Sequence, residues 1–300
     1  MIDFNVPRLK DCVLIDTKNW LQDNLQKLTI HRMSGRDIVT YITPAVDVRA
    51  EREEFQGRVK KGDILLLTRI ASEIAQYKSF GIDPEDRRYY EVPLMQVIGT
   101  FENNQVTFDN LKVLFDKIVV KKIETTKLGA LELPKSNTMI GEVIKTGWCR
   151  FDNDWNSHSL TVKVGDHVLL RDNVSTEITL GGETYYITEE AMVVGIFSSN
   201  VYSLENLKII NNSILFESYV PETALNSSLL TPSLNFENED VTDIYNRDLF
   251  RVVAVDPSLT KLKKDDIIMA DRNVTNYVYL YTDKYFILSG MDFVEAKVNK

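Results

Sequence analysis

The feature that most constrains the fold of this chain is a short pattern that occurs three times at a nearly constant interval. The clearest copy, residues 162–170, reads Val-Lys-Val-Gly-Asp-His-Val-Leu-Leu, and fainter copies span residues 59–67 and 262–269. An aspartate shared by the copies recurs about every hundred residues, which is the size of a whole domain and far longer than a solenoid repeat. These aspartates are Asp63, Asp166 and Asp266. The chain is therefore predicted to hold three copies of one small domain.

The spacing inside each copy supports this division. A strand-like opening segment follows Asp11, Asp116 or Asn212, and the shared aspartate comes about fifty residues later in all three copies. In the first copy, the turn formers at residues 80–86 add a short insertion that suits an extended hairpin. Polar, turn-prone stretches follow the closing strands of the first two copies. The predicted domains are residues 1–102, 103–199 and 200–300.

The pattern of apolar residues predicts an all-β protein. Short segments rich in Val, Ile, Tyr and Thr alternate apolar with polar residues and are separated by Gly, Asn, Asp and Pro, as in half-buried antiparallel strands. With 300 residues, 44% of them hydrophobic, each third can bury a core without a disulfide or a metal. The net charge of −9 argues against a broad nucleic-acid interface, because such an interface needs a basic face.

Motifs of enzyme chemistry are missing from the sequence. His31, His158 and His167 are scattered and lack metal-ligand spacing. The chain has no Gly-x-Ser-x-Gly, phosphate-cradling Gly-Lys-Ser/Thr or dinucleotide-binding Gly-x-Gly-x-x-Gly motif. We therefore expect no catalytic residues, no metal and no cofactor. The apolar runs are too short to cross a membrane and the N-terminus does not resemble a secretory leader, so we expect a soluble, cytoplasmic protein.

The central copy resembles a known family in most of its strands. The segments that carry the resemblance are Phe115–Lys121, Gly141–Gly147, Lys163–Asp166, Ser175–Glu177 and Tyr185–Ile187. Together they are similar to the opening strand, central strand and closing half of the co-chaperonins, of which GroES is the bacterial example. The resemblance covers nearly all of residues 114–197. It implies a small GroES-like β-barrel there, and the internal spacing extends this to three tandem GroES-like barrels, the outer two divergent.

Residues 125–134 occupy the position of the family's mobile loop. In co-chaperonins this loop presents two aliphatic side chains flanking a variable residue, and these dock on the chaperonin ring. By position, Leu131 and Leu133 match the anchors, Glu132 the variable residue, Gly129 the hinge glycine and Pro134 the closing proline. The alternative is an ordinary strand or hairpin whose two leucines face the core, as period-two alternation would also allow. The outer copies carry no such motif.

A second candidate contact lies in the segment that resembles the family's roof hairpin. Residues 148–155 contain three aromatic residues, Trp148, Phe151 and Trp155. They could form an exposed contact surface or pack locally.

Two functions from different classes follow from these observations. The resemblance implies a non-enzymatic co-chaperonin that docks on a chaperonin ring through the loop, assists protein folding and itself forms a homo-oligomeric ring. The alternative is a structural assembly protein, such as a phage virion component that decorates a capsid or forms a ring and contacts other virion proteins. Neither function involves nucleic acid or a membrane.

Overall fold

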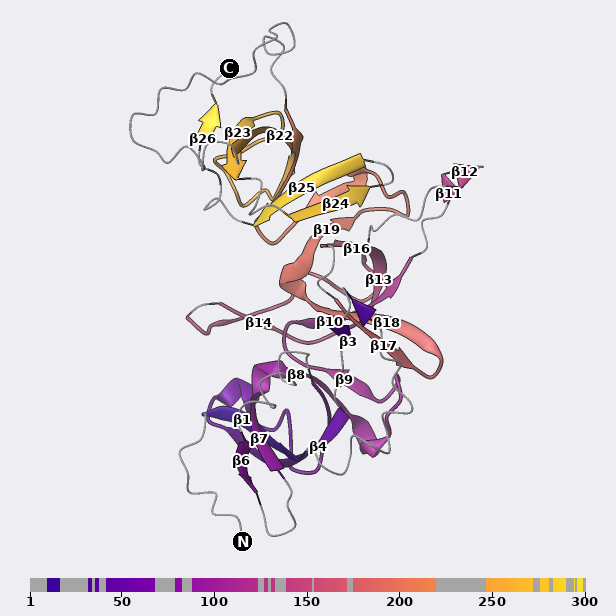
Figure 1. The fold of residues 1–300 in the computed structure, drawn as a ribbon, viewed down its shortest axis with the longest axis vertical. Helices are drawn as coiled ribbons and strands as arrows, with labels where there is room; N and C mark the ends of the chain where they lie inside the picture. The colour runs from indigo at the N-terminus through magenta and orange to yellow at the C-terminus, as the bar shows by residue number, and fades with distance from the viewer. Residues whose placement is uncertain are drawn as a thin grey trace, which may run out of the picture. The chain divides into compact units, whose positions relative to one another are not determined.

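The computed structural model describes most of the chain, and all structural statements below concern that part. It comprises residues 10–16, 32–33, 36–37, 42–67, 79–82, 88–123, 127–128, 131–132, 139–152, 154–171, 175–219, 247–271, 276–280, 283–289, 294 and 296–298. Within these ranges the regular structure consists of β-strands and single 3₁₀ turns (Figure 1). The predicted all-β class is thereby confirmed. No helix in the same ranges is long and apolar enough to span a membrane.

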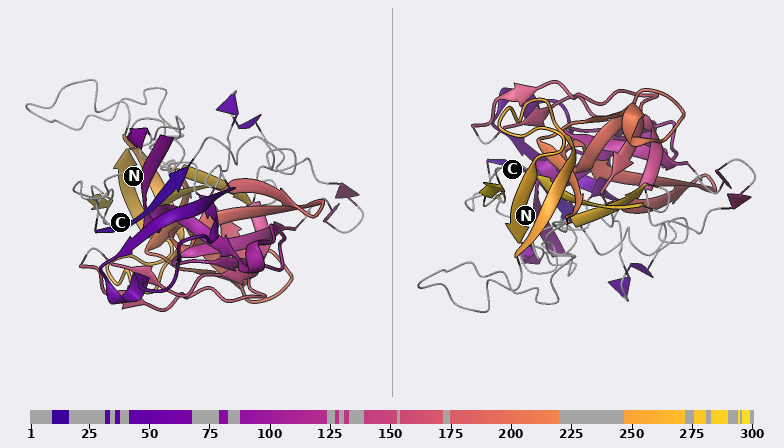
Figure 2. Two further views of the ribbon diagram at one scale, coloured as in Figure 1. Left: turned by 90° about the horizontal axis from the view of Figure 1, so that it is seen from below. Right: turned by 90° about the horizontal axis from the view of Figure 1, so that it is seen from above.

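Three large sheets with antiparallel pairings contain most of the described strands, which Figure 2 shows from two further sides. The first sheet has the order β6 (Ser79–Ile82), β7 (Arg88–Pro93), β1 (Asp11–Asp16), β4 (Ile42–Ala50), β5 (Ile64–Leu67), β8 (Val97–Phe101) and β9 (Leu111–Val113). The second has β17 (Thr176–Leu180), β18 (Glu183–Glu189), β10 (Lys117–Lys122), β13 (Met139–Thr146), β16 (His167–Leu170), β19 (Val193–Phe197) and β20 (Leu207–Ile209). The third has β24 (Asn276–Leu280), β25 (Asp283–Ser289), β21 (Ser213–Ser218), β22 (Arg247–Val255), β23 (Ile267–Asp271) and β26 (Ala296–Val298).

The remaining described elements are short ladders and 3₁₀ turns. Three two-stranded ladders pair β2 (Arg32–Met33) with β3 (Arg36–Asp37), β11 (Lys127–Leu128) with β12 (Leu131–Glu132), and β14 (Arg150–Phe151) with β15 (Ser157–His158). The 3₁₀ turns are η2 (Glu53–Phe55), η3 (Leu94–Gln96), η4 (Glu102–Asn104), η5 (Glu190–Met192) and η6 (Leu204–Asn206). Among the described strands, no pairing closes a large sheet into a barrel.

The three large sheets share one strand order. Each begins with a hairpin, continues with the strand that opens the copy, and then runs through three further strands in the same sequence. Register irregularities recur at corresponding places as well. They fall at Leu14/Ile15 and Leu215/Phe216 in the opening strands, and at Leu66/Leu67 and Leu169/Leu170 in β5 and β16. Because a bulge bends a strand at a defined position, its recurrence indicates a repeated local geometry.

The last strands of the first two sheets come from the joints between copies. β9 lies beyond the predicted joint at residue 102, yet it pairs with β8, and β20 pairs in the same way with β19. A glycine stands opposite each of these strands. A Cβ at Gly99 would lie 2.5 Å from the carbonyl oxygen of Lys112, and one at Gly195 would lie 2.7 Å from that of Lys208. Glycine therefore permits the same close approach at both joints.

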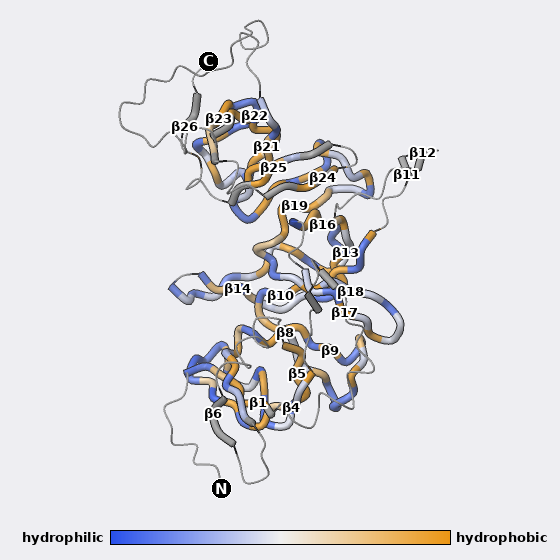
Figure 3. Tube along the Cα trace, viewed as in Figure 1, coloured by the Kyte–Doolittle hydropathy of each residue, from blue (hydrophilic) through white to orange (hydrophobic). Residues whose placement is uncertain are grey.

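The chain packs as two compact units, residues 1–122 with 143–165 and 175–190, and residues 123–142 with 166–174 and 191–300. In the first unit, one core fills the first sheet and a second joins that sheet to β10, β17 and β18 through residues such as Leu66 and Val119. In the second unit, Leu169 and Leu215 take part in an equivalent core, and another lies inside the third sheet. Hydrophobic stretches follow the strands of all three sheets (Figure 3).

Candidate functional site

The candidate loop leaves and rejoins its unit at a closed base. The backbone N–H of Ile123 donates to the carbonyl oxygen of Ile140 at 2.9 Å, and Ile123 packs against the core that contains Ile140. Beyond this base, β11 and β12 form a ladder of their own, with Lys127 opposite Glu132 and Leu128 opposite Leu131. The described strands of the large sheets do not pair with this ladder.

Two of the predicted loop residues thus lie in a described element, and three do not. The structure places the backbone of Leu131 and Glu132 in β12. Gly129, Leu133 and Pro134 lie outside the described residues, as do the side chains of Leu131 and Glu132. The predicted docking role of this loop accordingly stays a prediction.

A single carboxylate organises the turn of the hairpin that β14 and β15 form. The Asp152 carboxylate accepts hydrogen bonds from the backbone N–H groups of Asp154 and Asn156 at 2.9 and 2.8 Å. It also contacts Asn156 Nδ2 at 3.0 Å and His158 Nε2 at 2.9 Å. These contacts, led by that of His158, lower the pKa of Asp152 below its usual value because they stabilise the charged form.

The three aromatic residues predicted at the roof lie in or beside this hairpin and contact one another. Trp148 and Phe151 meet edge to face with ring centroids 6.2 Å apart, and Phe151 and Trp155 are 6.0 Å apart. Phe115 lies 6.1 Å from Trp148 and 6.3 Å from Phe151. The side chain of Trp155 is 46% exposed, whereas Phe115 is fully buried. The cluster therefore joins a buried base to a partly exposed tip.

The backbone at the base of the hairpin is packed too tightly for a side chain. The N–H of Gly147 donates to the carbonyl oxygen of Lys117 at 2.7 Å, and that of Trp148 donates to the carbonyl oxygen of Phe115 at 3.0 Å. A Cβ at position 147 would lie 1.9 Å from the oxygen of Phe115. Phe115 itself adopts a φ of 54°, a left-handed conformation that is uncommon for a bulky residue. The glycine and the strained phenylalanine together hold the two segments in contact.

Buried charged groups near the hairpin have structural partners. Glu190 is fully buried, and its Oε1 accepts hydrogen bonds from the backbone N–H groups of Thr161 and Val162. The Nζ of Lys117, also buried, lies 2.6 Å from Asp116 Oδ1 and 3.1 Å from Glu189 Oε1. Burial raises the pKa of the Cys149 thiol to about 11, so this thiol stays protonated at neutral pH.

Among the described residues, no group of three His, Cys, Asp or Glu side chains is placed to hold a metal ion. The carboxylates described above bind backbone N–H groups or neighbouring cations. Such contacts organise the fold.

Comparison with known proteins identifies the family of this region. Residues 110–197 match the family model for the chaperonin 10 Kd subunit. The segment is 37% identical over 92 residues to a co-chaperonin GroES from Hydrogenobaculum sp. (strain Y04AAS1), which covers 29% of this chain and 96% of that protein. It is 35% identical over 101 residues to the co-chaperonin GroES of Chlamydia felis (strain Fe/C-56), covering 32% of this chain and 99% of that protein. The chain therefore belongs to the co-chaperonin family, as its central copy predicted.

Proposed function

We propose that this protein is a non-enzymatic co-chaperonin that docks on a chaperonin ring through Leu131 and Leu133 and assists protein folding in the cytoplasm. The observation that carries the proposal is the match of residues 110–197, which spans almost the whole length of its GroES relatives and includes the loop position. The closed base at Ile123 and Ile140 supports it, because it anchors both ends of the candidate loop segment to each other.

We further propose that the outer copies are divergent GroES-like barrels, within the predicted domains 1–102, 103–199 and 200–300. Support comes from the shared strand order and from the recurring register irregularities. The packing between copies also recurs. Val119, Tyr185 and Ile187 face the preceding sheet in one core, and Leu215, Tyr285 and Ile287 take the corresponding places in another.

A homo-oligomeric ring in which each chain contributes one docking loop fits this arrangement. Only the central copy has the loop motif, so each chain would offer a single weak contact. Several such loops on one ring would raise the overall affinity, since each further contact becomes intramolecular. The alternative of a virion structural protein has no support from the two relatives compared above, both of which are named co-chaperonins.

The proposal is tested by replacing both anchors, Leu131→Asp with Leu133→Asp, and measuring retention on the immobilised chaperonin ring of the source organism with nucleotide present. Burying two leucines contributes about 3 to 6 kcal/mol, so binding should fall by about a hundredfold or more. Val201→Asp is the matched control, because Val201 is 61% exposed and lies outside the loop. Equal retention of the double variant and the parent, or no retention of the parent, would contradict the proposal.

A further inference from the structure

The segment around η2 in the first copy carries three residues at a spacing of three, and each contacts an aromatic ring of the central copy. Hydrogen bonds from Phe55 N to Arg52 O (3.1 Å), Gln56 N to Glu53 O (3.2 Å) and Arg58 N to Phe55 O (3.3 Å) close consecutive turns in this segment. Because Arg52 and Gln56 are extended and Gly57 has a φ of 69°, these turns do not form a continuous 3₁₀ helix, and Arg52, Phe55 and Arg58 are grouped by their shared contacts with the aromatic cluster. We call these three residues the η2 row.

The contacts of the η2 row are specific at each position. The guanidinium carbon of Arg52 lies 3.6 Å from the ring centroid of Trp155, and that of Arg58 lies 4.2 Å from the ring of Trp148. Between them Phe55, only 1% exposed, meets the ring of Phe151 at 5.4 Å. Cations over indole rings and edge-to-face aromatic pairs are both attractive geometries. The row therefore matches the aromatic cluster residue by residue.

Phe55 also completes a core that neither copy builds alone. Its ring lies 5.0 Å from that of Phe115, at an interplanar angle of 87°. Both belong to the core that fills the first sheet, against which Trp148 and Phe151 of the central copy pack. Removing the hairpin would expose this core, and removing Phe55 would leave a cavity in it.

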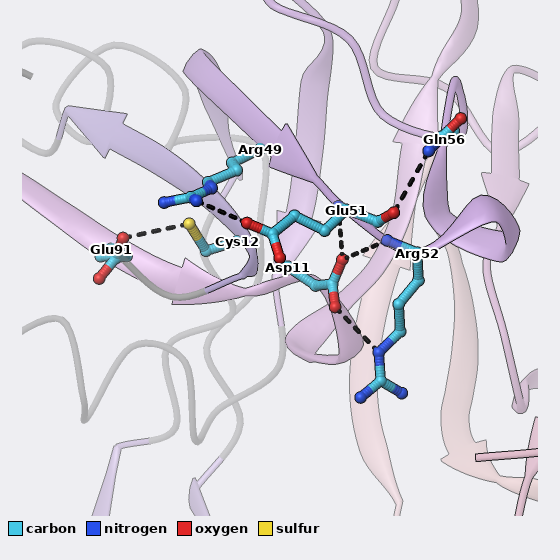
Figure 4. A network of polar contacts seen from close by, with 7 residues as sticks. All are labelled: Asp11, Cys12, Arg49, Glu51, Arg52, Gln56 and Glu91. Carbon is cyan, nitrogen blue, oxygen red and sulfur yellow. Dashed lines mark hydrogen bonds and ion pairs between the residues drawn. The ribbon is translucent and has the colours of Figure 1, made fainter. Parts of the chain in front are cut away.

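Arg52 is held in place from the side of the first copy (Figure 4). The Asp11 carboxylate accepts hydrogen bonds from the backbone N–H groups of Glu51 and Arg52 and forms an ion pair with Arg52 Nε at 3.1 Å. Gln56 Nε2 donates to the carbonyl oxygen of Glu51 at 3.3 Å. The Nη1 of Arg52 is buried and has no hydrogen-bond partner among the described residues, so the guanidinium is held by the Asp11 carboxylate at Nε and by the indole face of Trp155.

We propose that the η2 row is the docking element through which the first copy holds the β14–β15 hairpin, so that residues 51–58 and 150–158 open and close as one cooperative unit. The aromatic residues of the hairpin then serve an interface inside the chain, with the first copy as the partner. Trp155 is the contact nearest to solvent, and Arg52 is its positioning residue. This inference does not depend on chaperonin binding.

Hydrogen exchange of the full-length chain tests the proposal through Arg52→Ala. The amides of Asp152 and Trp155 are hydrogen-bonded within the hairpin, to the carbonyl oxygens of Asn156 and Asp152. Arg52→Ala changes neither bond directly, yet it should accelerate exchange at both amides by about three- to tenfold. Conversely, Trp155→Ala should accelerate exchange of the Gln56 amide, which follows η2 and donates to the carbonyl oxygen of Glu53. Unchanged exchange in the hairpin of Arg52→Ala would overturn the proposal.

Two comparisons separate cooperative opening from other effects. Arg49→Ala is the matched control, because Arg49 lies on the neighbouring strand and pairs with the exposed Glu51, and it should leave hairpin exchange as in the parent. The double variant Arg52→Ala with Trp155→Ala should exchange at the hairpin amide of Asp152 no faster than Trp155→Ala alone, since the contact between Arg52 and Trp155 is already lost in the single variant. Equal acceleration in β21 and β25 of the third sheet would instead indicate global destabilisation and would refute the proposal.

Discussion

Asp152 organises the hairpin turn with one carboxylate, and this gives the turn a defined response to acid. Its contacts to His158, Asn156 and Asp154 favour the ionised form and lower its pKa in the folded state. A carboxyl whose folded pKa is depressed contributes stability above its unfolded pKa, and that contribution disappears as the pH falls through the folded value. Asp152 should therefore stay ionised between pH 5 and 8, because this range lies above even the usual aspartate pKa of about 3.9. Its contribution to the stability of the hairpin should not change within that range.

The acid response is tested by following the amide chemical shift of Asn156 as the pH is lowered. In the parent, the transition that comes from Asp152 should fall below about pH 4, because the depressed pKa delays protonation of this carboxylate. Asp152→Asn keeps an acceptor oxygen but cannot titrate, so its Asn156 signal should lack this acid transition. An identical transition in parent and variant would show that another group titrates.

At the scale of elements, the hairpin depends on the close backbone contact between Gly147 and Phe115. No other residue type could take position 147 without moving one of the two segments, since even a Cβ would overlap the oxygen of Phe115. The strained φ of Phe115 persists because its ring is fixed by the aromatic cluster.

Gly147→Ala should accordingly lower the free energy of unfolding by about 3 kcal/mol, the upper part of the range for forced overpacking. Urea denaturation measures this change. Gly182→Ala is the control: Gly182 has a φ of +86° but nothing within 4 Å of its Cβ position, so it should lose only about 1 kcal/mol from backbone strain. Equal losses in the two variants would show that the close approach to Phe115 carries no special cost.

Several elements could be predicted from the sequence because their signals are local. Comparison of the three copies placed the opening strands directly after Asp11, Asp116 and Asn212, where β1, β10 and β21 lie, with β1 beginning at Asp11 itself. The strands β9 and β20 could not be assigned from the sequence, because tertiary packing decides that each pairs with the sheet before it. The η2 row was missed because a single 3₁₀ turn is too short for a periodic signal. Its spacing of three does not predict a common face either, because the backbone at Gln56 and Gly57 departs from helical geometry.

At the scale of the whole molecule, the family match and the repeated topology concern different parts of the chain. The match identifies residues 110–197, whereas the shared strand order extends to strands before and after these residues. Strands donated across both joints and cores shared between successive copies indicate that the copies stabilise one another. The docking loop, by contrast, was placed by resemblance, and its residues still need a functional test.

If this chain docks on a chaperonin ring, it should change the rate at which the ring of its source organism hydrolyses ATP. Measuring that rate with increasing amounts of the protein is the direct test. Purified protein should change that rate in a saturable way, because docking loops that bind the ring alter its nucleotide cycle. The Leu131→Asp, Leu133→Asp variant should have no effect at the same concentrations. A rate that stays constant with the parent protein, while a single-domain co-chaperonin GroES changes it, would show that this chain does not dock on the ring.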